Sequence, residues 1–175
     1  MSRTGTIEHV AELYEDQRIT AIGLLAETFH GLSARFAAQF EGHKLSPVEF
    51  EVLMRLARSP GHELRMTELA AQTSLSTSGV TRVVDRMERD GVLRRRACPS
   101  DRRSSYAVVT DAGMARLRET LPGHLELIEQ WFTGQLPPDE LARLLTSLRK
   151  IRDAVNPCAT AGAHTRAVEQ TSADA

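Results

Sequence analysis

Apolar residues recur at the spacing of an α-helix over much of this 175-residue chain. From Ile7 to Phe40 they return every three or four residues without an intervening proline. This pattern predicts one long helix, with a possible bend at Gly23 or Gly31. Such a helix has more apolar surface than it can bury by itself, so the pattern also predicts a partner that covers it.

A second helix is marked at both of its ends. Ser46-Pro47-Val48-Glu49 combines a capping Ser, a Pro in the first turn and a Glu placed as in a capping box. Pro60-Gly61 then stops the helix, because neither residue continues it well. A short third helix is predicted for about residues 67–72.

A further helix is predicted from Ser76, which can cap it, to Asp90, where Gly91 closes it. Its apolar stripe comprises Val80, Val83, Val84 and Met87. Its opposite face is polar and largely cationic, with Ser78, Thr81, Arg82, Asp85, Arg86 and Arg89. Two short helices joined by a tight polar turn, the second with a cationic free face, are typical of a helix-turn-helix.

Two short strands are predicted next, at residues 92–97 and 105–109. The loop between them, residues 98–104, contains Pro99 and the basic pair Arg102-Arg103. A β-hairpin with a basic loop that directly follows such a helix is typical of the wing of a winged helix-turn-helix.

The C-terminal part returns to helices. Thr110-Asp111 starts a helix with apolar spacing as far as Phe132, in which Pro122-Gly123 must introduce a kink or an interruption, and we expect a kink. Residues 136–140 start a last helix with a narrow apolar seam, which Asn156-Pro157 stops. The small and polar residues that follow predict a disordered tail.

Charge is divided unevenly along the chain. The formal net charge is −1, but residues 64–110 contain nine arginines and five acidic residues, a local charge of +4 that leaves −5 for the remainder. This division predicts a cationic module on an acidic helical scaffold, as in proteins that bind nucleic acid. Lysine occurs only at positions 44 and 150, and a GC-rich genome would explain that preference for arginine equally well.

Several classes of protein are excluded by what the sequence lacks. No apolar run approaches the roughly 20 residues of a membrane span, and the N-terminus does not resemble a secretory signal, so we expect a cytoplasmic protein. Cys98 and Cys158 are too few for a disulfide framework or a zinc site. Paired carboxylates, a phosphate-binding loop and metal-ligand spacings are also missing, so we expect neither an enzyme nor a cofactor.

The segment STSGVTRVVDRMERDGVLRRRACPSDRRSSYAVVTDAG resembles the MarR family of winged helix-turn-helix transcription regulators. Asp101-Arg102-Arg103 matches the Asp-x-Arg of that family's wing. Residues 109–113 match its Leu-Thr-x-x-Gly start of the next helix, with Val109 in place of Leu. The order of predicted elements agrees with the family from about Ile7 to Val155.

The resemblance implies a mainly α fold with a small β-hairpin wing. Its divisions are an N-terminal dimerisation helix at 1–45, a winged helix-turn-helix DNA-binding domain at 46–110, C-terminal dimerisation helices at 111–155 and a disordered tail at 156–175. It also implies a homodimer that binds a pseudo-palindromic double-stranded operator, with half-sites about 10 bp apart. Repression is the usual activity in this family, and release by a small ligand is common.

The predicted DNA contacts begin at the start of the recognition helix. They are Ser76, Thr77, Ser78, Thr81, Arg82 and Arg86. Arg82 suits a bidentate contact with guanine, unless it pairs with Asp85 instead. Arg86 lies further along the helix, where a phosphate contact fits better.

In the wing, the family pattern implies that Arg103 enters the minor groove while Asp101 braces the loop. Arg102 is the neighbour expected to touch a phosphate. The three arginines at 94–96 alternate across a strand, so they cannot all face DNA. At least one of them is expected to pair with an acidic residue.

Many family members bind small aromatic or carboxylate ligands between the dimerisation helices and the DNA-binding module. Polar residues expected near that crevice are His30, Arg35, His43 and Arg55, although exposed surface side chains would explain each equally well. The chain lacks the N-terminal Cys of the peroxide-sensing branch. Its single Trp, Trp131, does not lie in the first helix as in the urate-responsive branch.

Three alternatives stay open at this point. DNA binding could be independent of any ligand, or it could respond to oxidation of Cys98, whose thiolate the neighbouring arginines would favour. A helical scaffold without DNA binding is the third, but it would not require the arginines at positions 82, 86, 102 and 103.

Overall fold

The computed structural model describes residues 14–98 and 101–159, with the backbone alone described at 101–103. Its elements in chain order are α2 (Gln17–Gly42), α3 (Pro47–Ala57), η1 (Pro60–His62), β1 (Glu63–Arg65), α4 (Met66–Thr73), α5 (Thr77–Arg89), β2 (Leu93–Cys98), β3 (Asp101–Val109), α6 (Asp111–Trp131), η2 (Thr133–Gln135) and α7 (Pro138–Val155). Within these residues, none of the helices is long and apolar enough to cross a membrane.

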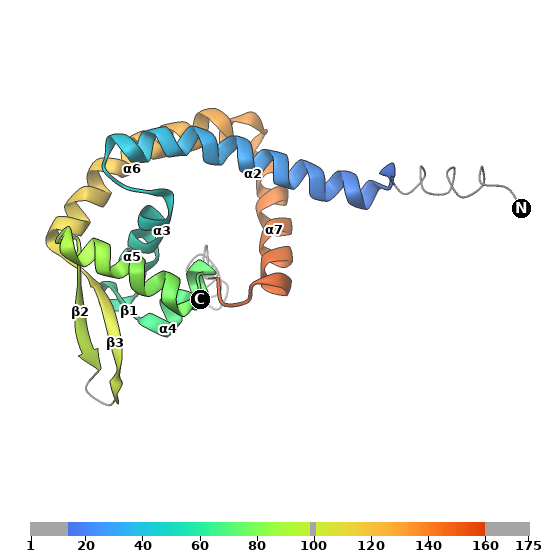
Figure 1. Ribbon diagram of the computed structural model, residues 1–175. Coiled ribbons are helices and arrows are strands. Elements are labelled where there is room, and N and C mark those ends of the chain that lie inside the picture. The colour runs from blue at the N-terminus through green and yellow to red at the C-terminus, as the bar shows by residue number, and fades with distance from the viewer. Residues whose placement is uncertain (1–13, 99–100, 160–175) are drawn as a thin grey trace, which may run out of the picture.

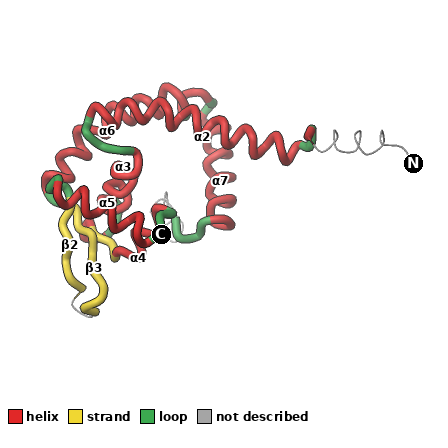
Figure 2. The backbone as a smooth tube through the Cα atoms, in the orientation of Figure 1, coloured by secondary structure: helices red, strands yellow, loops and turns green. Residues whose placement is uncertain are grey.

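The elements form a helix-turn-helix module joined to a frame of longer helices. Figure 1 shows α2 and α6 side by side, with α3, α4, α5 and the sheet at one end. The β2–β3 hairpin projects away from the helices (Figure 2) and forms the wing. The end of α7 returns to the turn between α4 and α5, where Asn156 Nδ2 donates a hydrogen bond to Ser74 Oγ at 3.3 Å.

The core lies where α3, α4 and α5 meet the sheet. Apolar side chains with 2% exposure or less are Val52, Leu53, Leu56, Leu69, Val80, Val84, Met87, Val92, Leu93 and Ala107. The predicted apolar stripe of α5 is therefore confirmed, with Val83 partly buried against the same core. Burial of this stripe leaves the opposite face of α5 in solvent.

Local capping signals were predicted correctly. Ser46 Oγ accepts from the backbone N–H of Glu49, whose Oε2 accepts from the N–H of Ser46 at 2.8 Å, so the capping box is complete. Ser76 Oγ caps α5 by accepting from the N–H of Gly79 at 3.0 Å. Gly91 has a φ of 73°, the left-handed conformation in which a helix commonly ends.

The first helix differs from its prediction. Instead of running unbroken from Ile7 to Phe40, the chain breaks at Asp16, and α2 extends from Gln17 to Gly42. Asp16 is extended and caps the new helix by accepting from the N–H of Arg18 at 2.8 Å, which favours a fresh start there. The predicted residues before position 14 lie outside the described part.

The sheet also differs from its prediction, because the described residues form three strands in the order β1-β3-β2. β1 was not predicted, and β3 begins at Asp101, within the residues expected to form a loop. Cys98 pairs with Asp101 after an irregularity in the register, so the strands extend almost to the tip of the hairpin.

The C-terminal helices agree with prediction in their positions. Thr110 caps α6, which continues without interruption through Pro122 to Trp131, and Figure 2 shows that its path curves. α7 ends at Val155, one residue before Asn156-Pro157. Of the predicted disordered tail, residues 160–175 lie outside the described part.

Candidate nucleic-acid interface

The start of α5 presents small polar side chains to solvent. Thr77, Ser78 and Thr81 are exposed, and so is Ser76, although its hydroxyl also caps the helix. The turn before the helix depends on Ser74, which adopts a φ of 54° and closes α4. Short side chains at a helix start allow close approach of the backbone to a flat or grooved partner.

Arg82 is exposed on the same face of α5. The alternative pairing with Asp85 is not observed, because that carboxylate accepts from Arg95. Among the described residues, none forms a hydrogen bond or ion pair with Arg82 that would hold its guanidinium against the protein. Its donors therefore stay available for an external acceptor.

Arg86 has a structural partner that the sequence did not reveal. Its Nε lies 2.6 Å from Glu49 Oε1, and its Nη2 lies 3.5 Å from Ser46 Oγ. Glu49 is buried, and the pKa of its carboxyl is lowered: burial raises it, but hydrogen bonds from Ser46 and Arg86 outweigh that effect. The pair fastens the recognition helix to the start of α3, whereas the phosphate contact of Arg86 stays a prediction.

Two of the three arginines on β2 pair with acidic residues, as expected. Arg95 binds Asp85 and Glu88 of α5, and Arg96 binds Glu63 of β1. Arg94 is exposed, and no described side chain pairs with it. Arg95 therefore contacts the recognition helix, Arg96 contacts β1, and Arg94 faces solvent.

The base of the wing is held by a cluster around Tyr106. Arg65 and Arg96 occupy the positions opposite Tyr106 on the two neighbouring strands. Their guanidinium carbons lie 5.6 and 4.5 Å from the Tyr106 ring centroid, and Arg65 Nε donates to the Tyr106 hydroxyl at 3.2 Å. Cation–π contacts of this kind stabilise the face of a sheet on which they lie.

The wing tip contains the predicted Asp-x-Arg at the start of β3. The backbone of Asp101, Arg102 and Arg103 is in that strand, and their side chains lie outside the described part. Cys98, opposite Asp101, is 3% exposed. Burial of its thiol opposes ready oxidation and weakens the redox alternative.

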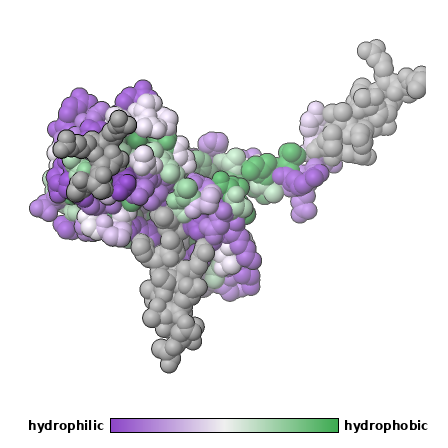
Figure 3. All heavy atoms as spheres, turned by 90° about the horizontal axis from the view of Figure 1, so that it is seen from below, coloured by the Kyte–Doolittle hydropathy of each residue, from purple (hydrophilic) through white to green (hydrophobic). Residues whose placement is uncertain are grey.

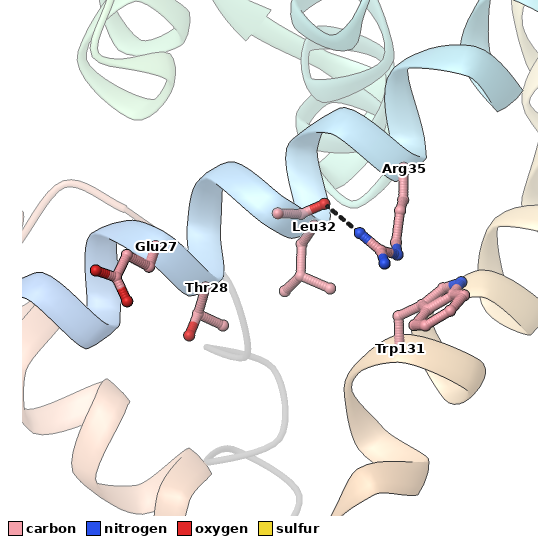
Figure 4. A pocket seen from close by; sticks show the side chains of 6 residues that line it. Glu27, Thr28, Leu32, Arg35 and Trp131 are labelled. Atoms are coloured by element: carbon pink, nitrogen blue, oxygen red, sulfur yellow. Dashed lines mark hydrogen bonds between the residues drawn. The ribbon is translucent and has the colours of Figure 1, made fainter.

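The four residues proposed for ligand binding are not brought to one pocket. His30 is exposed, His43 is half-buried, and Arg55 pairs with Glu51 along α3 at 3.1 Å. Arg35 lines an open pocket of about 240 Å³ (Figure 4) together with Glu27, Thr28, Gly31, Leu32 and Trp131. Its guanidinium carbon lies 4.1 Å from the Trp131 ring centroid, a contact that links α2 to the end of α6.

The apolar face of α2 changes from buried to exposed along the helix. Phe36 and Phe40 pack in or against the core, whereas Phe29, Leu25 and Ile22 are 66%, 48% and 60% exposed on the same face. Figure 3 shows this apolar surface on the projecting part of α2. We call these three residues the exposed seam. Tyr14 and, on α2, Ile19 and Leu24 are also exposed, and further exposed apolar residues on α6 and α7 are Leu125, Trp131, Ile151 and Val155.

A buried histidine lies where α2, α3 and α6 meet. His124 is 8% exposed, and its ring centroid lies 4.7–4.9 Å from those of Phe36, Phe40 and Phe50. Within the described residues, its Nδ1 has no hydrogen-bond partner. Burial lowers the pKa of His124 from its ordinary value, because the apolar surroundings disfavour the imidazolium ion.

We expect acid to destabilise the fold through His124. Since its folded pKa lies below the unfolded value of about 6.5, the unfolded chain binds the proton first, and stability is lost as the pH falls below that value. Urea midpoints should therefore fall further between about pH 7.5 and 5.5 for the wild type than for His124→Leu. The exposed His30→Asn should keep the wild-type dependence. Equal pH dependence in wild type and His124→Leu would contradict this prediction.

Fold and exposed face together define a winged helix-turn-helix protein, the class to which many transcription regulators belong. The model of the MarR family matches residues 45–105. The regulator YkoM of Bacillus subtilis is 34% identical over 128 residues, which are 73% of this chain and 80% of the relative. The chain therefore belongs to the MarR family. The repressor YetL of the same species is 37% identical over 89 residues, 51% of this chain and 53% of its own.

Solved structures agree with this assignment. AbsC, a MarR family regulator of Streptomyces coelicolor, has a TM-score of 0.74 and 29% identity over 80% of this chain and 95% of its own. Sco3205 of the same organism, solved in complex with DNA, has a TM-score of 0.72 and 33% identity over 80% of this chain and 87% of its own. BpsR of Bordetella bronchiseptica has a TM-score of 0.68 and 25% identity over 77% of this chain and 99% of its own, and its DNA binding is regulated by 6-hydroxynicotinic acid.

Proposed function

We propose that this protein is a transcription repressor that binds a pseudo-palindromic double-stranded operator as a homodimer. The observation that carries the proposal is the exposed face of α5, where small polar residues lie beside an Arg82 with no described partner. A relative of 33% identity has been solved bound to DNA, which supports the same role here. These relatives are named as regulators, and DNA binding would place the protein with the chromosome in the cytoplasm.

The contacts follow from the chemistry of each side chain. Arg82 would pair with O6 and N7 of guanine in the major groove, while Thr77, Ser78 and Thr81 approach base edges or phosphates. In the wing, Arg103 would enter the narrow minor groove, where the negative potential is highest, with Asp101 bracing the hairpin and Arg102 at a phosphate.

The homodimer is proposed from the exposed seam. Ile22, Leu25 and Phe29 continue a face that is buried further along α2, so a second copy would extend the same packing. This proposal keeps the division into a DNA-binding domain at 46–110 between dimerisation segments at 1–45 and 111–155. A two-fold axis would then present two α5 helices to successive major grooves.

An effector is proposed by analogy with BpsR and from the Arg35 pocket. A small aromatic carboxylate could bind the Arg35 guanidinium beside Trp131. This site lies between α2 and α6, which both belong to the proposed dimerisation segments. Of the four residues predicted for this role, Arg35 is the one that lines the pocket, so it is the first to test with such ligands.

The experiment is selection of duplexes from a random library with the full-length protein, followed by binding measurements on the selected site. We expect Arg82→Ala and Arg103→Ala each to weaken binding by about tenfold or more while the dimer persists. Arg82→Ala should also relax base preference at one position. Arg102→Ala should weaken all duplexes alike and reduce the salt slope by about 0.9.

Failure to enrich any duplex at low ionic strength would contradict the proposed function. Unchanged affinity in both Arg82→Ala and Arg103→Ala, with enrichment intact, would contradict the assignment of contacts alone. Arg143→Ala, at an exposed position on α7 outside the predicted interface, is the matched control and should bind the selected duplex as the wild type does.

A further inference from the structure

Arg95 joins the wing to the recognition helix. Its Nη1 donates to Asp85 and, at 3.0 Å, to Glu88 Oε2, and its Nη2 donates to the Thr81 carbonyl at 3.4 Å. Thr81, Asp85 and Glu88 lie on successive turns of α5, so they form one stripe along the helix. The guanidinium of Arg95 therefore lies along one flank of α5, beside the exposed face that is proposed to meet DNA.

The backbone of Arg95 takes part in the same contact. Among the strands of the described residues β2 is an edge strand, so the N–H groups on its outer side have no neighbouring strand there to accept them. The N–H of Arg95 donates instead to Glu88 Oε1 at 2.9 Å. Glu88 thus binds both the main chain and the side chain of one wing residue, which fixes the position of β2 relative to α5.

The contact also balances charge close to the proposed DNA surface. Asp85 and Glu88 are 49% and 38% exposed in their side chains, and Asp85 lies three residues from Arg82. Two free carboxylates at this place would repel DNA phosphates. Arg95, only 28% exposed, offsets part of this negative charge from the protein side.

We propose that Arg95 is a positioning residue for DNA binding. It acts through Asp85 and Glu88, by holding the wing at a fixed angle to α5 and by offsetting the two carboxylates, and it makes no contact with DNA itself. The inference rests on the proposed function and adds to it a residue that acts indirectly. A direct phosphate contact by Arg95 is the alternative that the experiment must separate.

The test is a double-mutant cycle on a duplex selected with the wild-type protein, measured by fluorescence anisotropy. Arg95→Met is expected to weaken binding by about tenfold. When Asp85→Asn and Glu88→Gln are already present, the same substitution should cost about threefold or less, because the uncompensated carboxylates are gone. A direct phosphate contact predicts the same loss in both backgrounds, and that result would overturn the proposal.

Two further measurements separate positioning from a general loss of stability. Arg103→Ala should cost less in the Arg95→Met background than in the wild type, because a displaced wing no longer delivers Arg103 to its groove. Unfolding curves identify conditions in which every variant is fully folded. Arg94→Met, one residue earlier on β2, should show no coupling to Asp85 and Glu88.

The proposal fails if the wild type binds the selected duplex but the cycle is additive. It also fails if Arg94→Met couples to the two acids as strongly as Arg95→Met does. A wild type that binds no duplex would instead contradict the proposed function, so the two failures are distinguishable.

Discussion

Replacing Phe29 with glutamate is expected to dissociate the dimer and to weaken operator binding by about 100-fold or more. Phe29 is 66% exposed and is the last residue of the exposed seam, between Leu25 and the partly buried Phe36 of the same helix face. A carboxylate at this position would have to lose its hydration when a second copy covers the seam. The monomer would then contact one half-site and lose the benefit of two linked contacts.

The measurement is the molar mass in solution, combined with affinity for the duplex selected by the wild type. Ala34→Glu introduces the same charge at an exposed position on α2, away from the seam, and should leave the dimer intact. A Phe29→Glu protein that remains a stable dimer would show that another surface joins the two copies. A monomer that binds the operator as tightly as wild type would contradict the two-half-site mode.

Helix ends could be predicted from the sequence because the interactions that define them are local. Ser46 and Glu49 are three residues apart, as are Ser76 and Gly79, and each pair forms the expected bond. The exposed face of α5 was predictable for a related reason. Once its apolar stripe is recognised, helical geometry places Arg82 on the opposite side.

Elements held by distant partners could not be predicted in this way. β1 has only three residues, and they form a strand because Glu63 and Arg65 pair with Val108 and Tyr106. The break at Asp16 was missed although its cause is local. Apolar periodicity continues across it and predicts one helix, whereas the cap at Asp16 favours a new one.

The same distinction applies to the site. Sequence reasoning recognised that some arginine on β2 must pair with an acid, but not which one. The partners of Arg86 and Arg95 come from α3 and α5, and their choice depends on how helices and strands pack. The burial of His124 among three phenylalanines is likewise a property of three helices together, and no local pattern marks it.

Gly113 shows how the structure explains a position that resemblance alone had marked. It lies in the first turn of α6, where its N–H donates to the capping Thr110 Oγ1 at 3.1 Å. A Cβ placed on Gly113 would lie 2.2 Å from the carbonyl oxygen of Val92 and 2.9 Å from Val109 Cγ1. The Val92 carbonyl cannot easily move, because it accepts the N–H of Thr110 at 3.2 Å and follows the turn that ends α5.

Gly113→Ala is therefore expected to lower the free energy of unfolding by about 3 kcal/mol, since the helix must shift away from the core to admit one methyl group. The melting temperature should fall by roughly 6–12 °C for a chain of this size. Gly23→Ala is the matched control, because within the described residues no atom beyond its own stretch of helix backbone lies within 4 Å of the added Cβ, and alanine favours a helix interior. Thermal unfolding followed by circular dichroism measures both variants. If Gly113→Ala melted with the wild type, the close approach of α6 to Val92 would not constrain the start of the helix, and the shared glycine would need another cause.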